Sequence, residues 1–175
     1  MILETPRFLL VPATAELVAL EITSSKALGT ALAAEVPADW PPEETVDALP
    51  WFLSRLKSDP SLSGWLNWYG LYREDTSQQP TLVSSAGFFG PPEEGCVEIG
   101  YSVLPTFQSR GFATEIVAGL VSWALSQPIV KCVTAETSSE NPASLRVLSK
   151  LGFTPAGPGR EDGHIRLERR EHMGN

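Results

Sequence analysis

Residues 96–126 constrain the fold of this chain more than any other stretch. Residues 96–103 alternate apolar side chains with small or polar ones, and that period of two predicts a strand with one face in the core. Pro105 predicts the end of this strand, since proline cannot continue a sheet ladder. Apolar side chains then recur at helical spacing in residues 116–125, which predicts an amphipathic helix. The chain must therefore pass directly from a strand into a helix.

The segment that joins them, residues 108–113, reads Gln-Ser-Arg-Gly-Phe-Ala. The first N–H groups of a helix have no partner within the helix, and the macrodipole adds positive charge there. Gly111 would let the backbone approach a ligand closely, and Arg110 adds a full charge. These features favour a phosphate or pyrophosphate site. An ordinary tight turn that requires glycine is the alternative, and local chemistry does not separate the two. The sequence has neither G-x-x-x-x-G-K-[ST] nor G-x-G-x-x-G, which argues against a P-loop and a dinucleotide fingerprint.

Residues 108–113 resemble the [QR]-x-x-G-x-[GA] motif of the GNAT N-acetyltransferase superfamily. Residues 141–153, Asn-Pro-Ala-Ser-Leu-Arg-Val-Leu-Ser-Lys-Leu-Gly-Phe, resemble the N-x-x-S/A…LGF segment of the same superfamily. The two segments follow one another in the expected order with a predicted strand between them. Two short stretches, Glu98-Ile-Gly-Tyr101 and Asn141-Pro-Ala-Ser144, are most similar to the RimJ/RimL-type branch. The resemblance covers residues 81–170 well and the first eighty poorly.

The order of predicted elements indicates a mixed α/β sheet with helices on its faces. The resemblance implies a GNAT-like, mostly antiparallel sheet of about seven strands with helices on both faces. It also implies a split between two parallel strands, at residues 96–103 and 129–136. We expect a single domain over residues 1–175. Its halves would be an acceptor side (1–80) and an acetyl-CoA side (81–170), followed by a tail (171–175).

The resemblance further implies acetyl-CoA as a cosubstrate, held in the split between the parallel strands, and no metal. Backbone groups near Tyr101 to Val103 would pair with the pantetheine arm, and N–H groups from Ser109 to Thr114 would hold the pyrophosphate. The expected cofactor-binding residues are Tyr101, Ser102, Val103, Gln108, Ser109, Arg110, Gly111, Phe112, Ala113, Thr114, Asn141 and Ser144.

Acetyl transfer to an amine requires a neutral amine and a polarised thioester carbonyl. Direct attack needs no covalent enzyme intermediate, so positioning supplies much of the rate. Glu98 is the candidate base, with a carboxylate in a structural pair as the alternative. Strand alternation points Glu98 away from the side of Val97 and Ile99, so as a base it must face the cleft. Ser144 is the candidate acid for the leaving thiol, with an ordinary helix-surface serine as the alternative.

Leu148 departs from the pattern of the superfamily. Many GNAT enzymes have a tyrosine seven residues after the asparagine, where it serves as the acid. Here that position is Leu148, which leaves acid catalysis open. A CoA-binding but catalytically inactive sensor or interaction domain is therefore the alternative to a working N-acetyltransferase.

Trp40, Glu98 and His164 are the candidate substrate-binding residues. Three prolines in residues 36–42 stiffen the loop that carries Trp40, and we expect this loop to expose the tryptophan. Trp65 and Trp68 have opposite parity in a predicted strand, so at most one should face the core. His164 falls in the last predicted hairpin. The acceptor could be a protein N-terminus or a small primary amine.

Net charge and cysteine use set the remaining expectations. The 175-residue chain carries a net charge of −8, which disfavours a nucleic-acid partner and suits an amine or basic peptide. Cys96 and Cys132 lack metal-ligand spacing, and we interpret them as reduced core residues. No apolar run approaches the 18 or so residues of a membrane span. The N-terminus lacks a signal-peptide h-region, so the cytoplasm is the expected compartment. A homodimer is one option for the oligomeric state.

Overall fold

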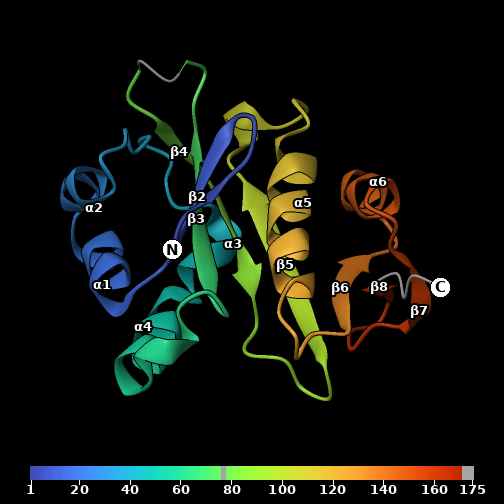
Figure 1. Ribbon diagram of the computed structural model, residues 1–175. Coiled ribbons are helices and arrows are strands. Elements are labelled where there is room, and N and C mark those ends of the chain that lie inside the picture. Colours follow the sequence, from blue (N-terminus) through green and yellow to red (C-terminus); the bar gives the residue numbers. More distant parts are fainter. Residues whose placement is uncertain (76–77, 171–175) are drawn as a thin grey trace.

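The computed structural model describes residues 1–75 and 78–170. Within them, eight strands form one sheet in the order β1-β2-β3-β4-β5-β6-β8-β7 (Figure 1). The strands are β1 (Leu3–Glu4), β2 (Phe8–Pro12), β3 (Asn67–Tyr72), β4 (Thr81–Phe88), β5 (Cys96–Val103), β6 (Cys132–Ser138), β7 (Thr154–Pro158) and β8 (His164–Arg170). The α-helices are α1 (Ala15–Thr23), α2 (Ser25–Leu32), α3 (Glu43–Val46), α4 (Leu49–Ser58), α5 (Phe112–Leu125) and α6 (Pro142–Lys150). Short 3₁₀ turns follow α4 and β5, at Pro60–Leu62 and Pro105–Phe107.

The sheet confirms the expected mixed, mostly antiparallel architecture. β5 and β6 run parallel, whereas the other neighbouring strands pair antiparallel. The strand beyond the expected seven is β1, two residues long, which pairs with β2 through Leu3 and Leu10. Its brevity explains why no period of two could identify it in the sequence.

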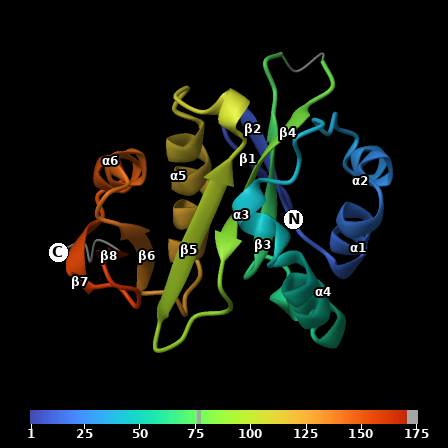
Figure 2. The ribbon, with the colours of Figure 1, turned by 180° about the vertical axis from the view of Figure 1, so that it is seen from behind.

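β5 and β6 pair at one end and part at the other. Their register covers Cys96–Glu98 against Cys132–Thr134. Beyond Glu98, β5 continues along β4 as far as Val103, while β6 continues along β8. The two strands diverge visibly in the view from behind (Figure 2). The expected split between parallel strands is therefore present.

Helices cover both faces of the sheet, as expected. α5 covers one face at the split, and α3 lies over the opposite face (Figures 1 and 2). One core cluster packs α5 against the sheet through residues such as Ile116 and Leu120. A second cluster includes residues of α1, α2 and α4, such as Val18 and Leu28, with Tyr69 of β3. Trp68 belongs to the first cluster and Tyr69 to the second, as strand alternation requires. In the part of the chain that the structure describes, no helix has the length and apolar character needed to cross a bilayer.

Local caps and a proline set where several of the helices begin and end. Thr14 caps α1, and Ser24 ends α1 and caps α2 by accepting a hydrogen bond from the N–H of Ala27 at 3.2 Å. The helical stretch between Glu43 and Ser58 is divided into α3 and α4. Pro50 sits in the first turn of α4, where its missing N–H costs no helical hydrogen bond.

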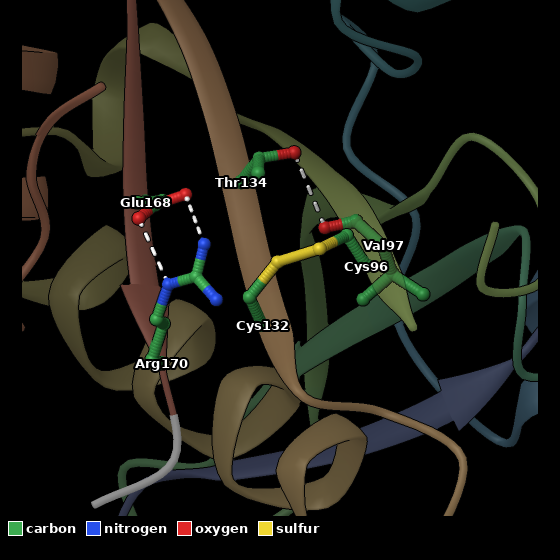
Figure 3. Close-up of a disulfide and its surroundings, with 6 residues drawn as sticks. All are labelled: Cys96, Val97, Cys132, Thr134, Glu168 and Arg170. Carbon is green, nitrogen blue, oxygen red and sulfur yellow. Dashed lines mark hydrogen bonds and ion pairs between the residues drawn. A yellow bond between two sulfur atoms is a disulfide. The ribbon is translucent and has the colours of Figure 1, made fainter. Parts of the chain in front are cut away.

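Cys96 and Cys132 form a disulfide that joins the paired ends of β5 and β6 (Figure 3). Our interpretation of them as reduced core residues is therefore wrong. The two cysteines are direct partners in the parallel register, and their Cα atoms lie 4.7 Å apart, within the range that a disulfide can bridge. Composition could not reveal this, because the pairing depends on the register of strands 36 residues apart. Next to the disulfide, Thr134 Oγ1 of β6 donates to the carbonyl of Val97 of β5 at 3.4 Å.

Trp40 is buried, contrary to the expectation that its proline loop exposes it. Only 6% of the residue is exposed, and its Nε1 donates to Oε1 of Glu21 at 3.0 Å. The hydroxyl of Tyr69 donates to the other carboxylate oxygen at 2.7 Å. Burial of the Glu21 side chain raises the pKa of its carboxyl group. A buried carboxylate on α1 therefore gives the indole N–H a partner, which the loop sequence could not indicate.

Trp65 and Trp68 both pack on Trp123 of α5, so the expectation that at most one faces the core is wrong. Their ring centroids lie 4.7 Å and 5.2 Å from that of Trp123. The alternation rule does not apply to Trp65, because β3 begins only at Asn67.

Candidate active site

A cavity of about 560 Å³ opens where β5 and β6 part. The end of β5, the start of α5 and one face of α6 line it, together with Glu44 of α3. The lining residues are Glu44, Tyr101, Ser102, Val103, Phe107, Gln108, Ser109, Gly111, Phe112, Ala113, Thr114, Asn141, Ala143, Ser144, Arg146, Val147 and Lys150. Most of the residues predicted to bind a cofactor are thus brought together around one cavity.

The start of α5 is shaped for a ligand at its backbone. Gly111, the N-cap, has φ +75°, and Ser109 also has a positive φ, +62°. The nearest atom to a Cβ built on Gly111 is Nη2 of Arg7, 3.7 Å away, so the backbone here is open to the cavity. Gln108 Nε2 donates to the carbonyl of Val103 at 2.9 Å, which ties the loop to the end of β5. The first residues of α5 line the cavity, and free N–H groups at a helix start are able to hold an anion.

The cationic side chains that line the cavity are ones that the sequence did not single out. Arg110 is not among the described residues that line the cavity. Its guanidinium lies over the rings of Phe107 and Phe112, at 5.4 Å and 5.9 Å. Arg146 and Lys150 of α6 line the cavity instead. Their i, i+4 spacing, on the same helix face as Ala143 and Val147, was the available signal.

Two hydroxyl groups meet across the split. The Tyr101 hydroxyl and Ser144 Oγ lie 2.8 Å apart, and either can be the donor. Ser144 is placed by the cap of α6, because its N–H donates to Oδ1 of Asn141 at 3.0 Å. Burial raises the pKa of Tyr101, so its proton is retained at neutral pH. This pair can deliver a proton to a group that leaves within the cavity.

Leu148 stands where many enzymes of the superfamily that the motifs resemble have a tyrosine as the acid, and it lies one helical turn after Ser144 on α6. It is fully buried in the core cluster under α5, whereas its neighbour Val147 lines the cavity. The position is therefore filled by core packing.

Glu98 occupies the last paired position of β5 and β6, opposite Thr134. Its side chain is only 20% exposed and forms an ion pair with Arg160, which comes from the loop between β7 and β8. Burial raises the pKa of Glu98, while Arg160 opposes the shift. Glu98 faces away from the core residues Val97 and Ile99. It lies on the same side of β5 as Ser102, which lines the cavity.

Glu98, Trp40 and His164 are not among the described residues that line the cavity. Trp40 lies in the second core cluster. Nδ1 of His164 lies 3.7 Å from a carboxylate oxygen of Glu161 on the β7–β8 loop. Among the described residues, no group of three or more His, Cys, Asp or Glu side chains is placed to hold a metal ion.

Comparison with known proteins finds a matching family model and similar proteins. A family model described as the acetyltransferase (GNAT) domain matches residues 7–154. The uncharacterized N-acetyltransferase YjdG of Bacillus subtilis (strain 168) is 31% identical over 120 residues, which cover 68% of this chain and 69% of the relative. A second relative from that strain, YoaA, is 32% identical over 90 residues, about half of each chain.

Solved structures match almost the whole chain in fold. RimL, a ribosomal L7/L12 α-N-protein acetyltransferase in complex with coenzyme A, superposes with a TM-score of 0.65 and 17% identity, covering 97% of this chain and 98% of RimL. The ribosomal-protein-S5-alanine acetyltransferase from Vibrio fischeri gives 0.67 and 15%, covering 99% and 98%. At these identities the likeness is one of fold.

Proposed function

Because this chain belongs to the GNAT acetyltransferase family and is therefore an acyltransferase, we propose that it moves an acetyl group from acetyl-CoA to a primary amine. The observation that carries the proposal is the cavity at the β5–β6 split. A helix start, two cationic side chains and a hydroxyl pair converge there.

The features of the cavity fit the parts of acetyl-CoA. The N–H groups at the start of α5 would bind the pyrophosphate, and Arg146 and Lys150 would add charge to its phosphates. The stretch Tyr101–Val103 has left β6, and its edge faces the cavity. An extended pantetheine arm could hydrogen-bond to that edge as an added strand does. Asn141 caps α6 and would lie beside the arm.

Glu98 and the hydroxyl pair would divide the proton transfers between them. Glu98 accepts a proton from the ammonium, and the neutral amine nitrogen then attacks the thioester carbonyl carbon. When the carbon–sulfur bond breaks, the thiolate takes the proton of Ser144, which Tyr101 can replace across their 2.8 Å contact. The nitrogen gives up its second proton to water as the amide forms, and water returns a proton to the hydroxyl pair. The attack is direct, so no acyl-enzyme forms and positioning supplies much of the rate.

The amine would reach Glu98 from the side of the sheet that α3 and the β7–β8 loop border. Residues 1–80 contribute Glu44 to the cavity rim, where Ser102 Oγ donates to its Oε2 at 3.1 Å. We assign this half to the acceptor and residues 81–170 to acetyl-CoA. A protein N-terminus and a small amine both remain candidate acceptors, and the RimL and ribosomal-protein-S5 neighbours act on ribosomal proteins by name.

Two measurements test the proposal. The first is thermal unfolding with and without CoA, and the second is thiol release from acetyl-CoA against a panel of small amines and N-terminal peptides. We expect CoA to raise the unfolding temperature and at least one amine to give turnover. A CoA shift without turnover on any acceptor would favour an inactive sensor domain, and no CoA shift would contradict the assignment of the cavity.

A further inference from the structure

Arg160 bridges two carboxylates that belong to different strands of the split. It forms an ion pair with Glu98 of β5, and its Nε lies 3.3 Å from Oε1 of Glu136 on β6. The side chains of Glu98 and Glu136 are 20% and 15% exposed, whereas that of Arg160 is 68% exposed. The carboxylates are thus built into the sheet, and the cation reaches them from solvent.

The β7–β8 loop is shaped to hold this arrangement. The backbone N–H of Arg160 donates to Oε2 of Glu136 at 3.0 Å, and that of Gly159 donates to the carbonyl of His164 at 2.8 Å. A Cβ on Gly159 would lie 2.6 Å from Cβ of His164, so only glycine lets the loop come this close. Glu136 keeps its place through the backbone of the loop, whatever the Arg160 side chain does.

Charge balance makes the Arg160 side chain replaceable by another cation. Four charged groups face one another here: Glu98, Glu136, Arg160 and Arg166, which is opposite Glu136 in the β6–β8 register. Together they are neutral. If the Arg160 guanidinium moves into solvent, one net negative charge remains on two half-enclosed carboxylates, and a cation from solution can neutralise it.

An exposed aromatic ring lies on the side of β5 that carries Glu98. Phe89, at the end of β4, is 59% exposed. Its ring atoms lie 3.0 Å from where a Cβ on Gly100 would be. Gly100 is on the same side of β5 as Glu98, so Phe89 covers the strand next to the base. An alkyl chain carried by an amine could pack on this ring.

Building on the proposed function, we propose that Glu136 binds the acceptor together with Glu98, and that Arg160 occupies the place of the acceptor's positive charge. The site then selects amines that carry a second cationic group close to the reacting amine, such as a short diamine or an N-terminal peptide with a basic side chain. Arg160 raises the selectivity by competing with acceptors of lower charge.

The test measures equilibrium binding of 1,4-diaminobutane and n-butylamine to the CoA-saturated protein by calorimetry. The variants are Arg160→Gln and Glu136→Gln, of which the second retains an oxygen for the Arg160 N–H. We expect wild-type protein to bind the diamine about fivefold tighter than the monoamine, in proportion to one partly exposed ion pair. Arg160→Gln should tighten diamine binding by about fivefold more, and Glu136→Gln should reduce the affinity for the diamine to that for the monoamine.

Glu168 and Arg170 provide matched controls. They form another Glu–Arg pair, at 3.0 Å, toward the other end of β8 (Figure 3). Glu168→Gln and Arg170→Gln should leave the preference for the diamine unchanged.

Three results would overturn the proposal: a diamine preference that survives Glu136→Gln, diamine binding that Arg160→Gln leaves unchanged or weakens, or equal binding of both amines to wild-type protein. Thiol release, measured in parallel with acetyl-CoA in place of CoA and with the same two amines, keeps the two proposals separate. Diamine selectivity without turnover would count against the proposed reaction alone, and turnover without selectivity would count against the second carboxylate alone.

Discussion

The two ends of the β5–β6 pair contrast in what holds them. At one end, a disulfide and three register pairs join the strands, and the Thr134 side chain adds a hydrogen bond. At the other end the strands no longer pair with each other: β5 pairs with β4 there and β6 with β8, and a cavity lined mainly by β5, α5 and α6 lies beside them. A sheet can thus open a cavity without losing its continuity, provided that one end of the open pair of strands stays fixed.

The largest effect should come from breaking the fixed end. Replacing both cysteines, Cys96→Ala with Cys132→Ala, removes the cross-link around a 36-residue separation. We expect the free energy of unfolding, measured by urea titration, to fall by about 3 kcal/mol. Wild-type protein with a reductant is the matched control and should lose a similar amount. Equal stability of the oxidised and cysteine-free proteins would show that the cross-link contributes nothing.

Blocking the open end should nearly abolish cofactor binding and leave stability largely intact. Gly111→Trp fills the approach to the first N–H groups of α5, and Gly111 has a positive φ that other residues adopt poorly. We expect the Kd for CoA, measured by calorimetry, to rise at least ~100-fold, because the ligand loses the helix start and meets a bulky ring.

Gly163→Trp is the matched control for this substitution. Gly163 has a similar φ, +79°, with open space around it, and it does not line the cavity. The variant should show the same backbone strain and bind CoA normally. If both substitutions weaken CoA binding equally, backbone strain is the cause, and the open end is not the cofactor site.

Glu98 lies where the fixed end gives way to the open end, and its removal should separate chemistry from cofactor binding. Glu98→Gln should lower kcat by about 100-fold and leave the Kd for CoA unchanged. A control that keeps the base but alters a nearby carboxylate is Glu161→Gln, on the exposed β7–β8 loop. If kcat at saturating amine is unchanged at neutral pH and also at high pH, Glu98 is not the base.

The same residue sets an expected pH dependence. Burial raises the pKa of Glu98, Glu136 adds to the shift, and Arg160 and Arg166 oppose it. A base must be ionised to act, so kcat should fall as the pH drops through a pKa above the ordinary carboxyl value of 4.5. Glu98→Gln should remove this acidic limb from the pH–rate profile.

The smallest effect should come from the hydroxyl pair across the open end. Ser144→Ala removes the proposed donor to the leaving thiolate, and kcat should fall by about tenfold, since water can supply the proton in its place. Tyr101→Phe is the companion variant, because it removes only the second hydroxyl and should have a weaker effect. A larger loss with Tyr101→Phe would make Tyr101 the direct donor.

Local periodicity and two motifs predicted the half of the fold that builds the open end. The strand at residues 96–103, the glycine turn and α5 follow one another in the chain, so sequence order alone brings them together. Asn141 and Pro142 mark the start of α6 equally clearly, because an N-cap followed by proline is a local signal. Membership in the GNAT family and the mixed sheet could be predicted because the motifs and the periodicities are also local signals. Both predictions are confirmed.

The features that escaped prediction depend on contacts between distant segments. The disulfide requires knowledge of which residue of β6 lies opposite Cys96, and the burial of Trp40 depends on Glu21 on another helix. Arg160 sits in a loop whose sequence indicates only a turn, and its partners come from two other strands. The residue roles at the open end stay predictions that the variants above test.

The disulfide also helps to fix the point about which the two strands can part. The strands are cross-linked at Cys96 and Cys132 and stay paired as far as Glu98 and Thr134, so the gap at Tyr101–Val103 can widen or narrow by rotation about that paired end. Three to five residues of strand beyond Glu98 make an arm of about 10–17 Å at ~3.3 Å per residue. A rotation of about 5° at the paired end would therefore move Tyr101–Val103 by about 1 Å.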